Sequence, residues 1–275
     1  MVQITEIQLN NRKISNRDPA IMIAGMNVIE SEELCMSVAG ELVKICEKNN
    51  VDLIFKASFD KANRSSIASF RGLGVDQGLK ILKKVKDEFN VPIISDIHEP
   101  AQAETAGEIL DVIQIPAFLS RQTDLIKAAC ETKKVINIKK AQFLSPLQMI
   151  NIIEKCNHFG NQKILLCERG SIFGYDNLIV DFLGIDEIKK IAPTILDITH
   201  SLQIPGGKGK SADGRSSQAK VLGTAAAAIG LAGFFIEVHP IPENALCDGA
   251  SATKLSEFES LLLELKKFDE LSKSL

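Results

Sequence analysis

The chain has 275 residues and a formal net charge of −3, with 45% hydrophobic residues, no Trp and one Tyr. This length and this hydrophobic content suffice for the large core of a single α/β barrel domain. The weak net charge and the scarcity of large aromatic rings argue against a nucleic-acid partner, because such proteins carry a basic surface or a stacking platform for bases.

Residues 1–17 predict a small β-hairpin. Apolar and polar residues alternate at 2–4 and, after a break in phase, again at 7–9. The two asparagines at 10–11 favour a turn between two short strands. We expect this hairpin to cap the bottom of the barrel that the rest of the chain predicts.

Eight short apolar runs follow, and continuous runs of this kind suit parallel strands that are buried on both faces. Segments with helical periodicity lie between them, for example at 74–89, 145–156 and 256–268. Strands that alternate with helices predict a closed (β/α)8 TIM barrel as one domain over residues 1–275, with an open doubly wound sheet as the alternative. The eight runs span residues 20–25, 51–57, 91–96, 111–115, 134–139, 163–168, 195–199 and 233–238.

Two segments near the end of the chain need a separate interpretation. Residues 205–218 are rich in Gly, Ser and charge and have no apolar period, which predicts a mobile active-site loop. The GKS triplet in this loop does not form a P-loop motif, because Ile204 stands where that motif requires Gly. Residues 221–236 are apolar but interrupted by Thr224 and by glycines, so we expect a helix followed by a strand, and no contact with a membrane.

The cysteines and the N-terminus bear on the compartment. Six cysteines are scattered along the chain without a CxxC pair, a pattern typical of reduced, buried thiols. The first residues contain no apolar segment of the kind that a signal peptide carries. We therefore expect a cytoplasmic protein.

Polar residues gather at the predicted carboxyl ends of the strands, where barrels of this class carry their chemistry. Any one of them alone could be an ordinary solvent-exposed residue at a strand end. Three of the four histidines fall at these ends, and we assign the fourth, His158, to the end of a helix. In chain order the ends carry Asn27; Lys56, Lys61, Asn63, Arg64 and Ser65; Asp96, His98 and Glu99; Gln114; Lys139 and Lys140; Glu168 and Arg169; Asp197 and His200; Glu237 and His239.

The cations of this set point to an anionic ligand. Cations that share one barrel mouth repel one another, so such a cluster indicates that phosphates or carboxylates compensate them. The carboxylates nearby offer acid–base groups or partners for hydroxyls. Residue types and spacing thus predict an enzyme that acts on phosphorylated, hydroxylated small molecules. The cations are Lys56, Lys61, Arg64, Lys139 and Arg169, and the carboxylates are Asp96, Asp197, Glu237 and Asp248.

Eight motifs, in order along roughly residues 4–265, together resemble the 3-deoxy-D-manno-octulosonate 8-phosphate synthase family. They are IAGMNVIES, FKASFDKANRSS, DIHEP, QIPAFLSRQTDL, NIKKAQFLSP, CERGSIFGYDNLIVD, DITHSLQ and IEVHPIPENALCDGAS. The resemblance implies a homotetrameric (β/α)8 barrel of the cytoplasm. It also implies the condensation of phosphoenolpyruvate with D-arabinose 5-phosphate and water during lipopolysaccharide biosynthesis, with no cofactor.

The same resemblance implies roles for individual residues. Lys139 and Arg169 would hold the phosphate and carboxylate of phosphoenolpyruvate, with Lys61 between the two substrates and Lys56 among the substrate-binding cations. Arg121 would reach a neighbouring subunit's site, with a cap role inside its own chain as the alternative. The pentose phosphate would bind Asn63, Arg64 and Ser65. The reacting centre would contain Asn27, Lys61, Asp96, Gln114, His200, Glu237 and Asp248, and which of them activates water is left open.

The resemblance further implies the metal-independent form of the family. The metal-dependent form ligates a divalent ion with a cysteine after the first barrel strand, and with a histidine, a glutamate and an aspartate that match His200, Glu237 and Asp248. Asn27 stands at the cysteine position, and a neutral amide oxygen is a much weaker ligand than a thiolate. We therefore expect no bound metal, and we expect Asn27 to bond the substrate or to orient its neighbours.

Two alternatives remain at the level of sequence. The related enzyme that makes 3-deoxy-D-arabino-heptulosonate 7-phosphate from erythrose 4-phosphate shares the barrel and the cations, but we expect a KPRT-like motif there in place of KANRSS. A non-catalytic barrel that binds phosphate ligands would be expected to lack part of the polar rim.

Overall fold

The computed structural model describes residues 3–64, 66–175, 177–204 and 213–275. Within them, eight parallel strands close into a barrel, because the last strand of the series pairs with both its first and its seventh strand. This closure confirms the predicted (β/α)8 barrel and excludes the open sheet. The barrel strands are β3 (Ile21–Val28), β4 (Leu53–Ser58), β5 (Ile93–Asp96), β6 (Val112–Ile115), β7 (Val135–Lys139), β8 (Ile164–Glu168), β11 (Thr194–Asp197) and β14 (Gly233–His239).

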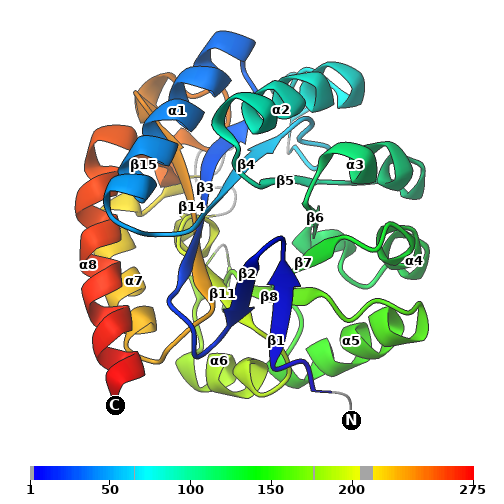
Figure 1. Cartoon of the computed structure of the whole chain (residues 1–275), viewed down its shortest axis with the longest axis vertical. Helices are drawn as coiled ribbons and strands as arrows, with labels where there is room; N and C mark the ends of the chain where they lie inside the picture. Colours follow the sequence, from blue (N-terminus) through cyan, green and yellow to red (C-terminus); the bar gives the residue numbers. More distant parts are fainter. Residues whose placement is uncertain (1–2, 65, 176, 205–212) are drawn as a thin grey trace.

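Helices alternate with these strands and form a ring around them (Figure 1). Their apolar faces pack on the barrel, as in the helix over Val75–Phe89, where Leu79, Leu82 and Val85 are all buried. The helical periodicity of the sequence follows from this one-sided burial. The helices are α1 (Glu32–Lys48), α2 (Val75–Phe89), α3 (Ala103–Ile109), α4 (Thr123–Glu131), α5 (Met149–His158), α6 (Phe182–Lys189), α7 (Ala219–Ala227) and α8 (Leu255–Ser274).

The predicted N-terminal hairpin is confirmed. Strands β1 (Glu6–Leu9) and β2 (Arg12–Ser15) pair antiparallel around a turn in which Asn10 adopts the left-handed conformation at φ 50°. The Ile4 N–H donates to the Ile191 carbonyl, and the Asn16 amide bonds the chain just before β11. The hairpin therefore covers the N-terminal end of the barrel, which Figure 1 views end on.

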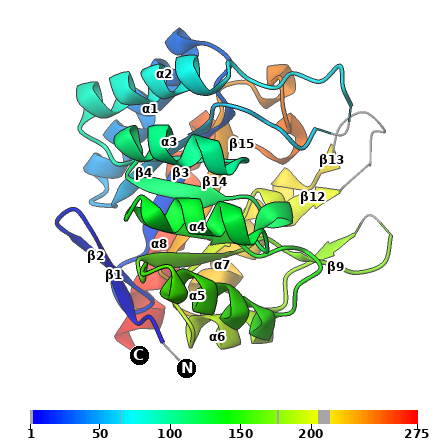
Figure 2. The same cartoon turned by 90° about the vertical axis from the view of Figure 1, so that its right-hand side faces the viewer.

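Short elements that the sequence analysis did not predict lie at the opposite, C-terminal end (Figure 2). Two ladders, β9 (Ser171–Ile172) with β10 (Leu178–Ile179) and β12 (Gln203–Ile204) with β13 (Asp213–Gly214), extend the loops after β8 and β11. Strand β15 (Thr253–Lys254) pairs with the end of β14. Most of the predicted loop 205–218 lies outside the described residues, and its described end carries β13 and a 3₁₀ turn at Ser216–Gln218.

The core is continuous from the barrel interior to the helices, and the predicted strand runs differ from the observed strands by only a few residues. All six cysteines are buried and free. No helix in the described part of the chain has the length and apolar character needed to cross a membrane.

Candidate active site

A cavity of about 210 Å³ opens at the C-terminal ends of the barrel strands. Its walls come from loops or strand ends after most of the barrel strands, as expected for this class of barrel. The structure brings together there most of the residues that the sequence predicted. These are Lys61, Asn63, Arg64, Asp96, Gln114, Lys139, Arg169, His200, Glu237 and Asp248.

Of the other predicted residues, three are described and do not line this cavity. Asn27 and Lys56 are buried directly behind Glu237. Arg121 is exposed, in the turn that follows the cavity-lining Phe118. Ser65 lies outside the described residues.

Lys56 and Glu237 form a buried ion pair behind the cavity. The Lys56 ammonium donates to Glu237 Oε1 at 2.5 Å and to the carbonyl oxygens of Met26 and Asn27 at 3.1 and 2.8 Å. An ammonium group has three N–H donors, and all three are taken. The predicted role of Lys56 as a substrate ligand therefore does not fit this arrangement, because no donor remains for a substrate.

Burial and charge oppose each other at this pair. Burial lowers the pKa of Lys56 to about 8, against the attraction of Glu237. Burial would raise the pKa of Glu237, but the cations around it, together with His200, lower that pKa to about 2. Glu237 therefore stays a carboxylate at neutral pH.

Asn27 bridges two carboxylates. Its Nδ2 donates to Glu237 Oε2 and, at 3.3 Å, to Asp248 Oδ2. A bulge in β3 between Gly25 and Val28 directs this side chain inward. Gly25 is required there, because a Cβ would lie 1.9 Å from the Lys56 carbonyl oxygen.

His200, Glu237 and Asp248 lie around the Asn27 amide. His200 Nε2 lies 3.6 Å from Glu237 Oε2, but the Asn27 N–H groups occupy the space between the Glu237 and Asp248 carboxylates. An amide nitrogen offers no lone pair to a cation, and only its oxygen is a ligand. Among the described residues, no group of three or more His, Cys, Asp or Glu side chains is arranged to hold a metal.

A second buried network connects Lys139, Asp197 and His200. Asp197 Oδ2 accepts from the Lys139 ammonium and from His200 Nδ1, the latter at 2.7 Å. The Lys139 ammonium also lies 3.3 Å from the centroid of the Phe235 ring, within range of a cation–π interaction. Burial opposes the charge on Asp197, but His200 and Lys139 outweigh it and hold its pKa below the usual value.

Asp96 and Lys61 both line the cavity. Asp96 accepts from Ser58 Oγ and lies 3.1 Å from His98 Nε2. Burial opposes the charge on Lys61, but Glu237 and Asp96 outweigh it and raise the Lys61 pKa. Lys61 forms no ion pair with any carboxylate of the described chain, so its charge is available to a ligand.

Arg169 directly follows β8, lines the cavity and is buried. Its Nη2 donates to Gln203 Oε1 at 3.0 Å, while its Nη1 has no partner in the described part of the chain. Burial lowers the Arg169 pKa, although an arginine remains charged at neutral pH. A buried donor without a partner is costly, so Arg169 is poised to bind an anion.

Arg64 and Gln114 are held by neighbouring side chains. Arg64 Nη1 contacts Cys247 Sγ at 2.7 Å and Asp248 Oδ1 at 3.2 Å. Burial raises the Cys247 pKa to about 12, so this group is a thiol and not a thiolate. Gln114 Oε1 accepts from Asn137 at 3.0 Å, which directs the Gln114 amide group.

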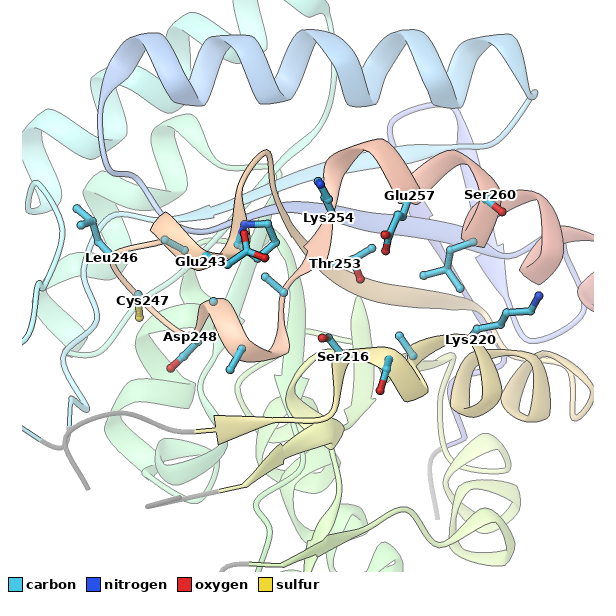
Figure 3. Close-up of a pocket in the computed structure, with 18 of the residues that line it drawn as sticks. Ser216, Lys220, Glu243, Leu246, Cys247, Asp248, Thr253, Lys254, Glu257 and Ser260 are labelled. Atoms are coloured by element: carbon cyan, nitrogen blue, oxygen red, sulfur yellow. The ribbon is translucent and has the colours of Figure 1, made fainter. Parts of the chain in front are cut away.

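The segment that carries Cys247 and Asp248 also lines a larger cavity of about 860 Å³ (Figure 3). Arg64 and Asp248 line both cavities. In the larger one, Lys220 is already paired with Glu264 at 2.7 Å. Volume is a weaker guide than chemistry, so we assign the active site to the smaller cavity, where buried cations and carboxylates converge.

The DAHP synthetase I family profile matches residues 3–274 of the chain. The chain belongs to this family.

Several curated relatives resemble the chain over nearly its whole length. A protein of Pseudoalteromonas translucida is 52% identical over 268 residues, 98% of this chain and 94% of its own. One of Shewanella amazonensis is 52% identical, covering 99% of this chain and 97% of its own. One of Psychromonas ingrahamii is 53% identical, covering 98% and 96%. All three are named 2-dehydro-3-deoxyphosphooctonate aldolase.

This DAHP synthetase I family member also has cavity residues that were not among the predicted catalytic or substrate-binding residues. Asp197 and His98 were noted at strand ends, and the additional signal for Asp197 is its position three residues before His200, which lets both share one turn. Gln142, Gln203 and Phe118 line the cavity from loops, and loop positions carry no periodic signal.

Proposed function

We propose that this chain condenses phosphoenolpyruvate with D-arabinose 5-phosphate and water, giving 3-deoxy-D-manno-octulosonate 8-phosphate and inorganic phosphate for lipopolysaccharide biosynthesis. The observation that carries the proposal is the near full-length likeness to proteins named 2-dehydro-3-deoxyphosphooctonate aldolase, at 52–53% identity. The composition of the cavity supports it independently.

The reaction brings two multiply charged anions together, which requires cations that are held in advance. Lys61, Lys139 and Arg169 enter the cavity from different strand ends, so they surround a ligand instead of lining one wall. In the proposal, Lys139 and Arg169 hold the phosphate and carboxylate of phosphoenolpyruvate, and Lys61 lies between the substrates. The unpartnered Arg169 Nη1 supports this assignment.

The pentose phosphate binds on the side of the β4–α2 loop in this proposal. Asn63 is exposed at the mouth, and the Arg64 guanidinium lies on a wall of the cavity. A phosphate would compete with Asp248 for Arg64, since both offer anionic oxygens to the same donor. Ser65 is the third predicted ligand of the pentose phosphate, and its assignment rests on the sequence alone.

The chemistry needs one carbon–carbon bond and one displaced phosphate. Carbon 3 of phosphoenolpyruvate attacks the pentose aldehyde carbon, and the aldehyde oxygen takes up a proton. Water adds to carbon 2 and loses a proton, and the bond between carbon 2 and the phosphate oxygen breaks. Carboxylates stabilise positive charge at carbon 2, and hydrogen-bond donors stabilise the developing alkoxide. The groups available are Asp96, Gln114, His200, Glu237 and Asp248.

We propose that the reaction needs no metal ion. Asn27 supports this by donating to both Glu237 and Asp248, which holds the two carboxylates where a cation would otherwise hold them. In this proposal Asn27 orients catalytic carboxylates and does not touch the substrate.

We also propose a cytoplasmic homotetramer in which Arg121 reaches a neighbouring site. Arg121 is exposed and does not line its own cavity. Large apolar side chains are exposed on the loops nearby, including Phe118 at 54%, Phe143 at 57% and Phe173 at 66% of full exposure, and such a surface favours burial against another subunit. The free, buried cysteines fit a reducing compartment.

The decisive experiment compares sugar phosphates. Purified protein with phosphoenolpyruvate is given D-arabinose 5-phosphate, erythrose 4-phosphate or both, and released phosphate and products are measured. We expect turnover with the pentose phosphate and a preference for it in competition. Preference for erythrose 4-phosphate would establish the activity of the related heptulosonate synthase instead. Absence of turnover with any aldose phosphate would support the alternative of a non-catalytic barrel that binds phosphate ligands.

A further inference from the structure

Asp197 is a fully buried cavity residue to which the proposed reaction gives no individual role. It is the last residue of β11, and His200 follows it by one turn. Within the described residues, its two oxygens accept hydrogen bonds from side chains that the proposed reaction uses or from their backbone. Oδ1 accepts from the His200 backbone N–H at 2.8 Å, and Oδ2 accepts from His200 Nδ1 and the Lys139 ammonium.

The contact with Nδ1 determines which nitrogen of His200 carries a proton. A carboxylate accepts hydrogen bonds and cannot donate them, so Nδ1 must be the donor. When His200 is neutral, Nε2 is then left with its lone pair. Nε2 lies 3.6 Å from Glu237 Oε2, too far for a direct hydrogen bond, and both atoms are acceptors. One O–H donor from water or a substrate hydroxyl fits this pair of acceptors.

The contact between Asp197 and Lys139 determines where the positive charge of the Lys139 ammonium lies. The ammonium group is held between Asp197 Oδ2 and the face of the Phe235 ring. Asp197 and the Phe235 ring attract the Lys139 ammonium from two directions. Because Lys139 lines the cavity, the remaining N–H donors are available to a ligand there. One carboxylate thus aligns an anion-binding cation and an acid–base histidine at the same time.

The backbone around Asp197 is fixed to the strand that carries Glu237. The Glu237 N–H donates to Thr199 Oγ1 at 2.8 Å, and the Ile198 N–H donates to the Phe235 carbonyl. The turn from Asp197 to His200 therefore cannot shift relative to Glu237 without breaking these bonds. Hydrogen bonds of this kind, behind the reacting groups, hold those groups in fixed positions relative to one another.

We propose that Asp197 is a positioning residue of the condensation reaction: it holds His200 with its Nδ1 proton inward and Nε2 toward the cavity, and it aligns Lys139 with the bound anion. This inference rests on the proposed function. It assigns Asp197 no contact with either substrate.

The test begins with the unaltered protein. With only four histidines in the chain, ¹⁵N-histidine labelling and NMR assign the tautomer of neutral His200 directly. We expect the proton on Nδ1, and a proton on Nε2 would overturn the proposal. In Asp197→Asn the side-chain amide can donate to Nδ1, so the tautomer should reverse. Glu168→Gln is the matched control, because Glu168 is another buried strand-end carboxylate that pairs with Lys140 and not with His200.

Kinetics supply the second readout. We expect Asp197→Asn to lower kcat roughly 100-fold and Asp197→Glu, which keeps the charge, to recover part of that loss. The losses of Asp197→Asn and His200→Gln should not multiply in the double variant, because one residue acts through the other. A folded Asp197→Asn protein with kcat within about threefold of the wild type would overturn the inference. A wild-type protein that does not turn over the two substrates would instead overturn the proposed function and leave the NMR result intact.

Discussion

The two sides of the reaction cavity treat their charges differently. On the side of β11 and β14, Asp197 is paired with Lys139 and Glu237 with Lys56, and these groups are buried. On the side of the β4–α2 loop, Lys61 has no carboxylate partner in the described chain, and Asn63 is exposed. The first side is organised: its charges are paired and held in place before substrate binds. On the second side, the charge of Lys61 is compensated only when an anionic ligand binds. We expect substitutions on the two sides to fail in different ways.

The largest effect is expected for Lys139→Ala on the organised side. It removes an anion-binding cation and also leaves Asp197 with one partner fewer, so kcat should fall by about 10³-fold or more. Stability should also fall, by about 3 kcal/mol, because Asp197 stays buried after losing one of its two side-chain partners. Phosphate release and urea denaturation measure the two effects. Near-normal turnover would show that Lys139 does not hold the substrate.

Arg64→Ala tests the other side. The loss of one charge-assisted hydrogen bond to the pentose phosphate should raise the KM for that substrate by roughly 10- to 100-fold. Stability should change little, because the ion pair of Arg64 with Asp248 is partly exposed at the boundary between two cavities. A variant with an unchanged KM for the pentose phosphate and a raised KM for phosphoenolpyruvate would reverse the assignment of the two sides.

Arg121→Ala tests whether the open side is completed by another subunit. We expect a loss of roughly 10-fold in kcat/KM. When subunits of this variant are mixed with subunits of Lys139→Ala and reassembled, some sites receive both intact residues, so turnover should exceed the sum of the separate variants. Strictly additive activity would support a role of Arg121 within its own chain.

The smallest effect concerns acid stability of the organised side. The Glu237 pKa is lowered from 4.5 to about 2, so the stability that the charged carboxylate contributes is complete above pH 4.5 and is lost as the pH falls from there toward 2. Between pH 6 and 4 this amounts to about 1 kcal/mol. Urea denaturation at both pH values should show that Glu237→Gln loses correspondingly less unfolding free energy between pH 6 and pH 4 than the wild type does. An equal loss in both proteins would contradict the lowered pKa.

The sequence predicted the barrel well because its strands are buried on both faces, and that burial demands continuous apolar runs. It also located the cavity, since strand ends meet at one rim whatever the details of pairing. It did not predict which side chains pair across that rim. Lys56 was expected at the substrate, yet it faces Glu237, which is 181 residues away in the chain. Such contacts depend on the register of neighbouring strands, which no local pattern encodes.

The roles of Asn27 and Asp197 illustrate the same limit. The replacement of a cysteine by Asn27 is visible in the sequence, but its bridge to Glu237 and Asp248 depends on the β3 bulge at Gly25. Asp197 was visible as a strand-end carboxylate, but its importance follows from its contacts with Lys139 and His200. Loop residues such as Gln142 and Gln203 have no periodicity, so only the folded chain reveals their place.

Turnover after exhaustive chelation shows whether the reaction needs a metal ion. The protein is treated with a strong chelator, its metal content is measured, and phosphoenolpyruvate is supplied with D-arabinose 5-phosphate. We expect full turnover at a metal content far below one ion per chain, because Asn27 and Lys56 hold Glu237 in place of a metal ion. Turnover that is lost on chelation and restored by an added divalent metal would contradict it.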